Sequence, residues 1–512
     1  MVGGVRMATG EYSVHGVVVR GVNEVNSSDY DALVVVLSPD TPSLHVLEDF
    51  IADALLLDKS LHKNVSVLRC PRVSGQRLVL SSTGPLTPYD DVRSVYEAAR
   101  AGVQRALAAG ARRPVLVAAT VARWPRSELV SILGALESLY VSLQRRERKP
   151  QTAADALGVY AEGARAPLDA LLREATALEE GRGLARDIGG SDPERMTPCR
   201  AADLLRDAFA GSGVSLRVLA DAAAIRDEYP LLAAVDRAAR AVPRHGGCVV
   251  LLEYAPEAYE HTYMLVGKGV TYDTGGCDVK TGGAMVGMSY DKCGAAAVAG
   301  LVLACAALRP PVKVVAALAM VRNSVGEEAY VADELVISRR GLAVRVGNTD
   351  AEGRMAMADL LAEMAKRAEG ERRPHLFTVA TLTGHAVRTV GEGYTIAVDS
   401  HAASVASRLA SEGATLADPV EVSTLRREDL AAHRGRAAGD DLLQAAPRPS
   451  TALPRGHQGP AAFLLLAAGL EAEGAPPYTH LDVAGSAGSL PASPTGAPLL
   501  ALAALMGLVK SC

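Results

Sequence analysis

The chain has 512 residues, of which 49% are apolar and 22% are charged, and its formal net charge is −5 at pH 7. This length exceeds what one hydrophobic core usually serves, so two domains are expected, and the apolar content excludes a disordered chain. The slightly negative charge gives no reason to expect a nucleic acid partner.

The first part of the chain, residues 1–175, is predicted to be a small α/β domain. Strand-like and helical patterns alternate along it, with strands expected at 32–37, 65–68 and 115–119 and helices at 92–107 and 127–144. It contains no recognisable set of catalytic residues. Helical spacing over residues 153–185 predicts a helix that leads into the second domain, residues 186–512.

The second part is predicted to contain a mostly parallel central sheet covered by helices, so the fold class is α/β with two domains. Strand-like runs alternate with helical patterns at 248–253, 263–266, 312–320, 342–346, 376–381 and 479–483. Such alternation is typical of parallel sheets with helices on both faces. Residues 418–459 are polar and proline-rich, and they are expected to form an ordered loop region.

Cysteine usage and hydropathy bear on the compartment. The seven cysteines form no C-x-x-C pair, which favours reduced thiols in a reducing compartment. The first residues lack the basic-then-apolar pattern of a secretion signal. The longest apolar run, 498–509, is too short to span a bilayer and is expected to be a buried C-terminal helix. We therefore expect a soluble cytoplasmic protein with no membrane partner.

Residues 348–354, Asn-Thr-Asp-Ala-Glu-Gly-Arg, place two carboxylates two positions apart at a predicted strand-to-helix junction. In α/β proteins ligands usually bind at the carboxyl ends of such strands. Crowded carboxylates repel one another unless a cation neutralises them, so Asp350 and Glu352 suggest a metal ion. The alternative is a set of salt bridges at strand ends.

A second cluster lies upstream and supplies Lys268, Asp273, Lys280 and Asp291. Together with Asp350 and Glu352 it makes four carboxylates, enough for two divalent ions with shared ligands. A lysine in such a cleft either balances charge or ligates as a neutral amine. Without cysteine or histidine ligands, the site is expected to exchange Zn, Mn, Co and Mg readily.

The segments GKGVTYDTGGCDVK and NTDAEGR resemble the signatures of the leucyl aminopeptidase family, the dizinc M17 peptidases. The resemblance runs from about residue 249 to the C-terminus, includes Thr-Leu-Thr-Gly at 381–384, and is strongest to the animal and protist aminopeptidase-like branch. One departure is Asp-Lys-Cys-Gly at 291–294 in place of the commoner Asp-Met-Gly-Gly. Lys292 and Cys293 could therefore alter metal preference or pH optimum.

The resemblance implies a role for each matching residue. The implied ligands of two metal ions are Lys268, Asp273, Asp291, Asp350 and Glu352. A metal-bridging water would attack the first peptide carbonyl, with the ammonium of Lys280 stabilising the oxyanion and Arg354 holding a bicarbonate general base. The implied substrate-binding residues are Met288, Asn348, Thr381, Leu382, Thr383, Gly384 and Ala484. The non-functional alternatives are that Lys280 is a solvated loop lysine, that Arg354 forms a salt bridge at the N-terminus of a helix, and that Met288 belongs to the hydrophobic core.

The function predicted in this way is a metal-dependent aminopeptidase that releases leucine-like N-terminal residues from peptides, and the family implies a homohexamer. One alternative is a narrow dipeptidase for substrates such as Cys-Gly. Another is a non-catalytic or moonlighting hexameric scaffold, of the kind that binds nucleic acid in some bacterial relatives. The intact set of ligands argues against the scaffold. His457 is expected to be a satisfied loop histidine.

Overall fold

The computed structural model describes residues 10–39, 44–161 and 163–510. The chain divides into two compact units. Among the described residues, the N-terminal unit is 10–39, 44–161 and 163–183 with the short segments Glu412–Ala417 and 507–510, and the C-terminal unit is Leu184–Ser411 with Asp418–Met506. Sequence order alone gave no indication that two segments from the end of the chain belong to the N-terminal unit.

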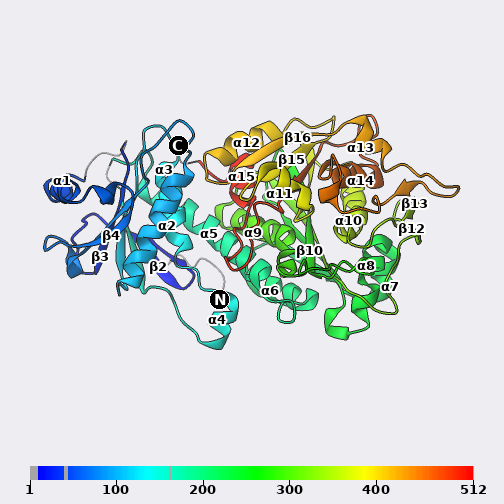
Figure 1. Ribbon diagram of the computed structural model, residues 1–512, viewed down its shortest axis with the longest axis horizontal. Coiled ribbons are helices and arrows are strands. Elements are labelled where there is room, and N and C mark those ends of the chain that lie inside the picture. Colours follow the sequence, from blue (N-terminus) through cyan, green and yellow to red (C-terminus); the bar gives the residue numbers. More distant parts are fainter. Residues whose placement is uncertain (1–9, 40–43, 162, 511–512) are drawn as a thin grey trace. The chain divides into compact units, whose positions relative to one another are not determined.

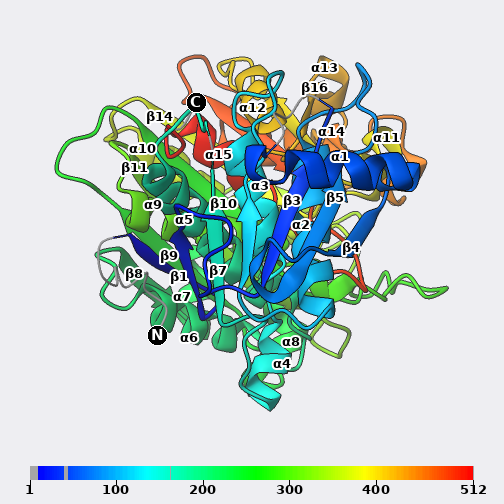
Figure 2. The same cartoon turned by 90° about the vertical axis from the view of Figure 1, so that its left-hand side faces the viewer.

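The N-terminal unit is built on a seven-stranded sheet in the order β1-β2-β7-β6-β3-β5-β4. Its central strands β2, β7, β6, β3 and β5 are parallel, and the two edge strands are antiparallel to their neighbours (Figure 2). The strands are β1 (Glu11–Val14), β2 (Val17–Gly21), β3 (Ala32–Leu37), β4 (Val65–Arg69), β5 (Arg77–Ser82), β6 (Pro114–Val117) and β7 (Ala156–Tyr160). The helices are α1 (Glu48–Leu57), α2 (Arg93–Ala108), α3 (Ser127–Glu137), α4 (Leu143–Arg148) and the first part of α5 (Leu168–Gly190).

Strand β7 corrects the prediction of a continuous helix over residues 153–185. Its five residues pair with β2 on one side and β6 on the other, so they complete the middle of the sheet. Gly158 permits this, because a Cβ there would lie 2.7 Å from the Tyr30 ring. The helix starts only at Leu168. The pairing of β7 with strands distant in sequence is information that local helical spacing does not carry.

The C-terminal unit has an eight-stranded sheet in the order β16-β15-β18-β14-β10-β11-β9-β8. Its centre, β18-β14-β10-β11, is parallel, which confirms the predicted fold class. The strands are β8 (Ser215–Leu219), β9 (Cys248–Tyr254), β10 (Thr262–Asp273), β11 (Lys313–Asn323), β14 (Pro374–Ala380), β15 (Thr395–Asp399), β16 (Val420–Thr424) and β18 (Tyr478–Asp482). A small separate sheet consists of β12 (Leu335–Ile337), β13 (Ala343–Arg345) and β17 (Leu442–Leu443).

Helices cover both faces of the central strands. Figure 1 shows β10 between α9 on one side and α8, α10 and α14 on the other. Buried apolar side chains from α8, α10 and α14 form one continuous core with strands β10 and β11. The helices of this unit are α6 (Pro198–Phe209), α7 (Ala222–Glu228), α8 (Pro230–Arg240), α9 (Cys293–Leu308), α10 (Glu352–Ala368), α11 (Gly384–Val390), α12 (Ala406–Ala414), α13 (Arg427–Ala431), α14 (Gln458–Ala468) and α15 (Leu499–Leu505).

Helix α9 lies directly on the sheet because glycines remove the side chains between them. A Cβ on Gly267 of β10 would lie 2.6 Å from the Ala295 Cα, and one on Gly294 would lie 2.2 Å from the Val379 carbonyl oxygen. Residues 288–308 are apolar and long enough to cross a membrane, but 83% of their most apolar window is buried inside the unit. That burial is what a core helix requires.

Two local expectations need correction. The strand before the Asn-Thr-Asp-Ala-Glu-Gly-Arg segment, β13, belongs to the small sheet and not to the main one. Residues 418–459, expected to be a loop, contain β16, α13 and β17. These elements are short and depend on pairing partners distant in sequence, so composition alone indicated only a loop.

Candidate metal centre

The acidic residues converge at the carboxyl ends of the parallel strands in the C-terminal unit. Asp273 is the last residue of β10, and Glu352 is the first residue of α10. Asp273, Asp350 and Glu352 each offer a carboxylate oxygen within 4.8 Å of the other two. Burial and the neighbouring charges of Asp273 and Glu352 raise the pKa of Asp350 to about 7. The three carboxylates therefore repel one another in a buried place, which a bound cation would relieve.

Lys268, from the middle of β10, is buried among these acids. Its ammonium contacts Asp291 Oδ1 at 2.7 Å and Glu352 Oε1 at 2.8 Å, and it donates to the Thr381 carbonyl at 3.0 Å. Burial alone would lower the pKa of Lys268, but attraction to Asp291 and Glu352 outweighs burial and raises it. The lysine thus balances the charge of the cluster in the structure described.

Lys280 contacts the other side of the cluster from the loop after β10. Its ammonium lies 2.9 Å from Asp273 Oδ2 and also donates to Asp350 Oδ1. Its side chain is 14% exposed, compared with 4% for Lys268, so Lys280 is the lysine nearer to solvent. Burial alone would lower the pKa of Lys280, but attraction to the carboxylates of Asp273, Glu352 and Asp350 outweighs burial and raises this pKa.

Asp291 follows a short 3-10 helix, Met288–Tyr290, and is held in place by a hydroxyl. Thr381, directly after β14, donates its hydroxyl to Asp291 Oδ1 at 2.8 Å. The second oxygen, Oδ2, is buried and has no hydrogen-bond partner. Burial raises the pKa of Asp291 well above its usual value. An unpaired buried carboxylate oxygen beside three more carboxylates is the donor set that a hard or borderline divalent ion prefers.

Two buried amides position the acidic loops, and the sequence did not reveal either of them. Asn323, at the end of β11, donates to Asp273 Oδ1 at 2.8 Å and to the Thr349 carbonyl at 3.1 Å. Gln444 accepts hydrogen bonds from the backbone of Gly347 and Asn348 and donates to the carbonyls of Asn348 and Ala351. Its side chain is fully buried and all four bonds go to the metal-binding segment.

Gly353 is required by its contact with Lys268. A Cβ at Gly353 would lie 2.5 Å from Lys268 Cε and 2.8 Å from its Nζ. The lysine side chain therefore passes directly over the first turn of α10. This contact explains why a glycine separates Glu352 from Arg354.

Arg354 is buried in that same first turn, with only part of its guanidinium satisfied. Its Nη1 donates to the Gln444 carbonyl at 3.0 Å, whereas its Nε has no hydrogen-bond partner. Burial lowers the pKa of Arg354 to about 10. A buried cation with an unused donor at a helix N-terminus is suited to a small anion.

The predicted substrate-binding loops share one buried carboxylate, Asp482, at the end of β18. It accepts hydrogen bonds from the Leu382 and Ala484 backbone and, at 2.7 Å, from the Thr383 hydroxyl. Thr383 also caps α11, which starts at Gly384. Asn348 binds the backbone N–H of Asp350 at 2.7 Å, and Met288 begins the turn before Asp291. The structure therefore gathers these residues around the carboxylates, and their contacts with substrate remain a prediction.

The Asp-Lys-Cys-Gly departure has a structural explanation. The ammonium of Lys292 is fully buried and donates to the carbonyls of Ser191, at 2.9 Å, and Ser289. Ser191 directly follows α5, so the lysine satisfies a carbonyl group at the end of that helix. Cys293 is buried at the start of α9, and burial raises the pKa of its thiol to about 12. The contacts of Lys292 are therefore with backbone oxygens.

His457 is buried, and both of its ring nitrogens have partners. Its Nδ1 lies 2.9 Å from His385 Nδ1 and its Nε2 lies 2.8 Å from the Ser423 hydroxyl. His480 forms a hydrogen bond with Thr378 within the sheet. Both ring nitrogens of His457 are therefore satisfied within the fold, as expected, whereas Nε2 of His480 is buried without a hydrogen-bond partner.

The residues present fit a metal centre. The carboxylates are close enough to share ions, one of their oxygens is buried without a partner, and two lysines offset their charge. Fold and site together define the class of metal-dependent hydrolases with an oxygen-rich centre at the carboxyl edge of an α/β sheet.

Comparison with known proteins narrows this class. Residues 183–503 match the cytosol aminopeptidase family, catalytic domain. The Caenorhabditis elegans protein named "Putative aminopeptidase W07G4.4" is 39% identical over 500 residues, which cover 94% of this chain and 95% of that protein. The chain belongs to the cytosol aminopeptidase family, and it is a metal-dependent aminopeptidase.

Solved structures support the fold. The apo structure of leucyl aminopeptidase from Trypanosoma cruzi has a TM-score of 0.79 at 18% identity and covers 94% of this chain and 93% of its own. The bottromycin maturation enzyme BotP in complex with Mn has a TM-score of 0.75 at 22% identity and covers 93% of this chain and 98% of its own. Both similarities extend over the two units.

Proposed function

We propose that the protein removes leucine-like N-terminal residues from peptides with two divalent metal ions per chain. The single observation that carries this is the convergence of Asp273, Asp350 and Glu352 within 4.8 Å, flanked by Asp291 and two lysines. The residues that would hold the ions are Lys268, Asp273, Asp291, Asp350 and Glu352. Zinc is the first candidate, exchangeable with manganese, cobalt or magnesium, because every donor is oxygen or amine nitrogen.

When bound, the ions supply an activated water and a Lewis acid for the peptide carbonyl. The residues of the chain supply the rest. The ammonium of Lys280 is the more exposed of the two lysines and would stabilise negative charge developing on the carbonyl oxygen. Arg354 would hold a bicarbonate through its unpaired Nε donor, and a bicarbonate held there would supply a general base.

Substrate selection is assigned to the residues gathered by Asp482 and to Met288, Asn348 and Thr381. Small side chains and one methionine would accept an apolar first residue such as leucine. Discrimination between similar side chains would be modest, since one methylene is worth only about 1–3 kcal/mol. The homohexamer and the cytoplasmic location are proposed on family grounds.

The test is hydrolysis of leucyl-7-amido-4-methylcoumarin by purified protein after chelator treatment and readdition of Zn, Mn or Co. Activity restored by metal in the natural chain and absent from Asp350→Ala would support the proposal and rank the metals. Folded, metal-loaded protein without activity would instead favour a narrow dipeptidase, which hydrolysis of Cys-Gly would reveal. Inactivity on both substrates would favour the non-catalytic scaffold.

A further inference from the structure

Two histidines meet directly beside the proposed substrate-binding segment, residues 381–384. His385 is the second residue of α11, which begins at Gly384, and His457 directly precedes α14. Their Nδ1 atoms are 2.9 Å apart, and their ring centroids are 5.0 Å apart at an interplanar angle of 40°. Since a neutral imidazole carries one N–H and one free nitrogen, a hydrogen bond at this distance places a single proton between the two rings.

The groups around His457 indicate which ring donates that proton. Its other nitrogen, Nε2, lies 2.8 Å from the Ser423 hydroxyl oxygen, which accepts a hydrogen bond from the Gln458 amide at 3.0 Å. The hydroxyl of Ser423 therefore has its own proton to donate to His457 Nε2. His457 then carries its proton on Nδ1 and donates it to His385. The hydrogen bonds thus run in one direction, from Gln458 through Ser423 and His457 to His385.

Burial and the neighbouring charges keep both rings uncharged at neutral pH. Burial is the main cause of a lowered pKa in both histidines, and the pKa of His457 falls to about 4. The cations add to this effect, Arg388 acting on His385 and Arg455 on His457. Asp429 of α13 acts on His457 in the opposite sense, but Arg455 binds this carboxylate at 2.6 and 2.8 Å. The two rings are therefore joined by a neutral hydrogen bond and not by an ion pair.

Glycines bring the loop before α14 against the first turn of α11. A Cβ on Gly456 would lie 2.7 Å from the Cβ of His385 and 2.2 Å from the Ser450 carbonyl oxygen. Gly384 is similarly close to the same loop, since a Cβ there would lie 2.8 Å from Thr451 Cγ2. The two elements are in direct contact through positions without side chains, so the hydrogen bond between the histidines fixes the first turn of α11 against this loop.

The residues before α11 connect this turn to the metal centre. Thr383 caps the helix and donates its hydroxyl to Asp482 at 2.7 Å. Two residues earlier, Thr381 donates its hydroxyl to Asp291 at 2.8 Å, and its carbonyl accepts a hydrogen bond from Lys268. The proposed substrate-binding segment is therefore held at one end by residues of the metal centre and at the other end by the histidine pair.

We propose that His385 and His457 are positioning residues for peptide binding. Their hydrogen bond holds residues 381–384 in the conformation that accepts the first residue of the peptide, and neither ring takes part in the chemical step. This role rests on the proposed function, in which the segment 381–384 binds substrate. Loss of the bond is expected to weaken the binding of substrate and transition state equally, which raises KM and leaves kcat unchanged.

Steady-state hydrolysis of leucyl-7-amido-4-methylcoumarin by the metal-loaded full chain tests this role. His385→Leu removes the acceptor nitrogen and is expected to raise KM about fivefold, as for one lost hydrogen bond, with kcat within about twofold of the natural chain. His385→Asn places an amide oxygen near the position of Nδ1, so KM should return to within about twofold of the natural value. His457→Leu should raise KM to a similar extent. The double leucine variant should be no worse than either single one, because both remove the same bond.

His375→Leu is the matched control. This buried histidine forms a hydrogen bond of 2.8 Å with Thr479 at the start of β14, whereas the segment 381–384 follows the end of that strand. His375→Leu should lower the free energy of unfolding and leave KM unchanged. His385 is only half-buried, so its variants carry the test even if the buried His457 does not tolerate leucine.

An unchanged KM in both leucine variants of the pair, in a natural chain that hydrolyses the substrate, overturns the positioning role alone. A KM raised equally by His375→Leu overturns it as well, because KM would then follow stability. The hydrogen bond is also refuted as the cause if His385→Asn does not restore KM. A folded, metal-loaded natural chain without activity on this substrate overturns the proposed function and this role with it.

Discussion

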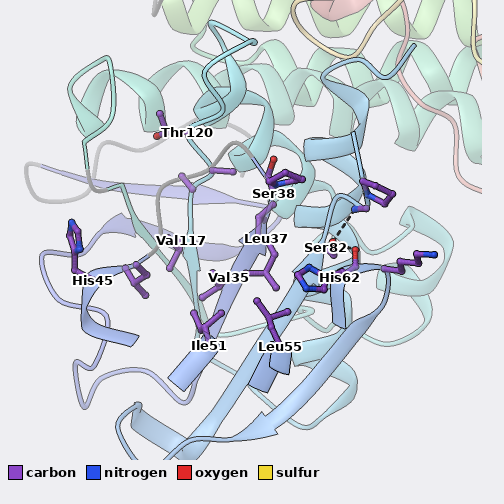
Figure 3. Close-up of a pocket in the computed structure, with 18 of the residues that line it drawn as sticks. Val35, Leu37, Ser38, His45, Ile51, Leu55, His62, Ser82, Val117 and Thr120 are labelled. Carbon is purple, nitrogen blue, oxygen red and sulfur yellow. Dashed lines mark hydrogen bonds between the residues drawn. The ribbon is translucent and has the colours of Figure 1, made fainter. Parts of the chain in front are cut away.

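Two carboxyl edges of parallel sheets, one in each unit, carry opposite kinds of chemistry. In the C-terminal unit the edge is filled by four acids and two lysines in direct contact. In the N-terminal unit the same topological position is an apolar cavity, lined by Val35, Val117 and Ile51 among others, whose described lining has no acid (Figure 3). The backbone therefore provides a crevice in both sheets, and the side chains at the strand ends decide its chemistry.

The two edges also differ in how their polar groups are satisfied. Most polar atoms of the metal centre are engaged with other buried groups, so removing one leaves another charge or amide unpaired. At the N-terminal edge the buried hydroxyl of Thr120 has no hydrogen-bond partner, so removing it leaves no other group unpaired. The predictions below test this contrast, from the largest expected effect to the smallest.

The largest effect is expected from Glu352→Gln. The change removes one of three converging carboxylates and one partner of the buried Lys268 ammonium. Hydrolysis of the leucyl substrate should fall at least about a thousandfold, because a metal-assisted route needs its ligands. Metal content, measured by mass spectrometry after digestion, should fall in parallel. Glu369→Gln, at the exposed end of the same helix, should leave both unchanged.

The next effect is expected from Gln444→Ala. Four backbone groups of the metal-binding segment would lose their partner in a buried place. The free energy of unfolding should fall by about 3 kcal/mol, measured by chemical denaturation, and activity should fall with it. Gln444→Glu keeps the acceptor oxygen and loses the donors, so its free energy of unfolding should lie between those of the natural chain and Gln444→Ala. Full activity in Gln444→Ala would refute the positioning role.

A similar loss of activity, without loss of any polar group, is expected from Gly353→Ala. The new Cβ would displace Lys268, whose Cε lies 2.5 Å from its position. Activity should fall about tenfold, since small displacements in an active site are costly. Gly326→Ala is the matched control, because the nearest atom to its Cβ is 3.8 Å away. Equal activity in both variants would contradict the steric argument.

A buried histidine in β14, His375, is expected to make the stability of the protein depend on pH. Burial lowers the pKa of His375 to about 4, so the folded chain resists protonation while the unfolded chain takes up a proton near its usual pKa of 6.5. The stabilisation is fully present above pH 6.5 and is lost as pH falls from 6.5 towards 4.

Denaturation of His375→Asn across this pH range measures the effect. The asparagine can still form a hydrogen bond with Thr479, the present partner of His375. The slope of unfolding free energy against pH should decrease by the contribution of one proton, while other buried histidines of the unit continue to contribute. An unchanged slope would mean that His375 titrates normally in the folded chain.

The smallest effect is expected from Thr120→Val in the N-terminal cavity. Replacing an unpaired buried hydroxyl with a methyl of the same shape should leave unfolding free energy unchanged or raise it by up to about 1 kcal/mol. Thermal denaturation measures this. A clear loss of stability would show that the hydroxyl has a partner within the fold, and the contrast between the two edges would fail.

The sequence predicted those parts of the site that are encoded locally. Asp350 and Glu352 are two residues apart, and β10 carries Lys268 and Asp273, so a strand and a turn bring most of the acids together. The roles of Gln444 and Asp482 escaped prediction, since each acts on a segment about a hundred residues away.

The same reasoning applies to the fold. Strand β3 was predicted with its observed limits, because six consecutive apolar residues are a strong local pattern. Strand β7 was mistaken for helix, since its identity depends on pairing with β2 and β6. The cavity could not be predicted either, because it depends on which way each connection turns.

The glycines under α9 bear on how freely this chain can vary. Gly267 and Gly294 stand where any side chain would collide with a backbone atom of the neighbouring element. A backbone cannot yield as a flexible side chain does, so no compensating substitution nearby can accommodate even alanine. A library of variants that alters the peptide preference should therefore hold these two positions fixed and place its diversity in the loops after β14 and β18.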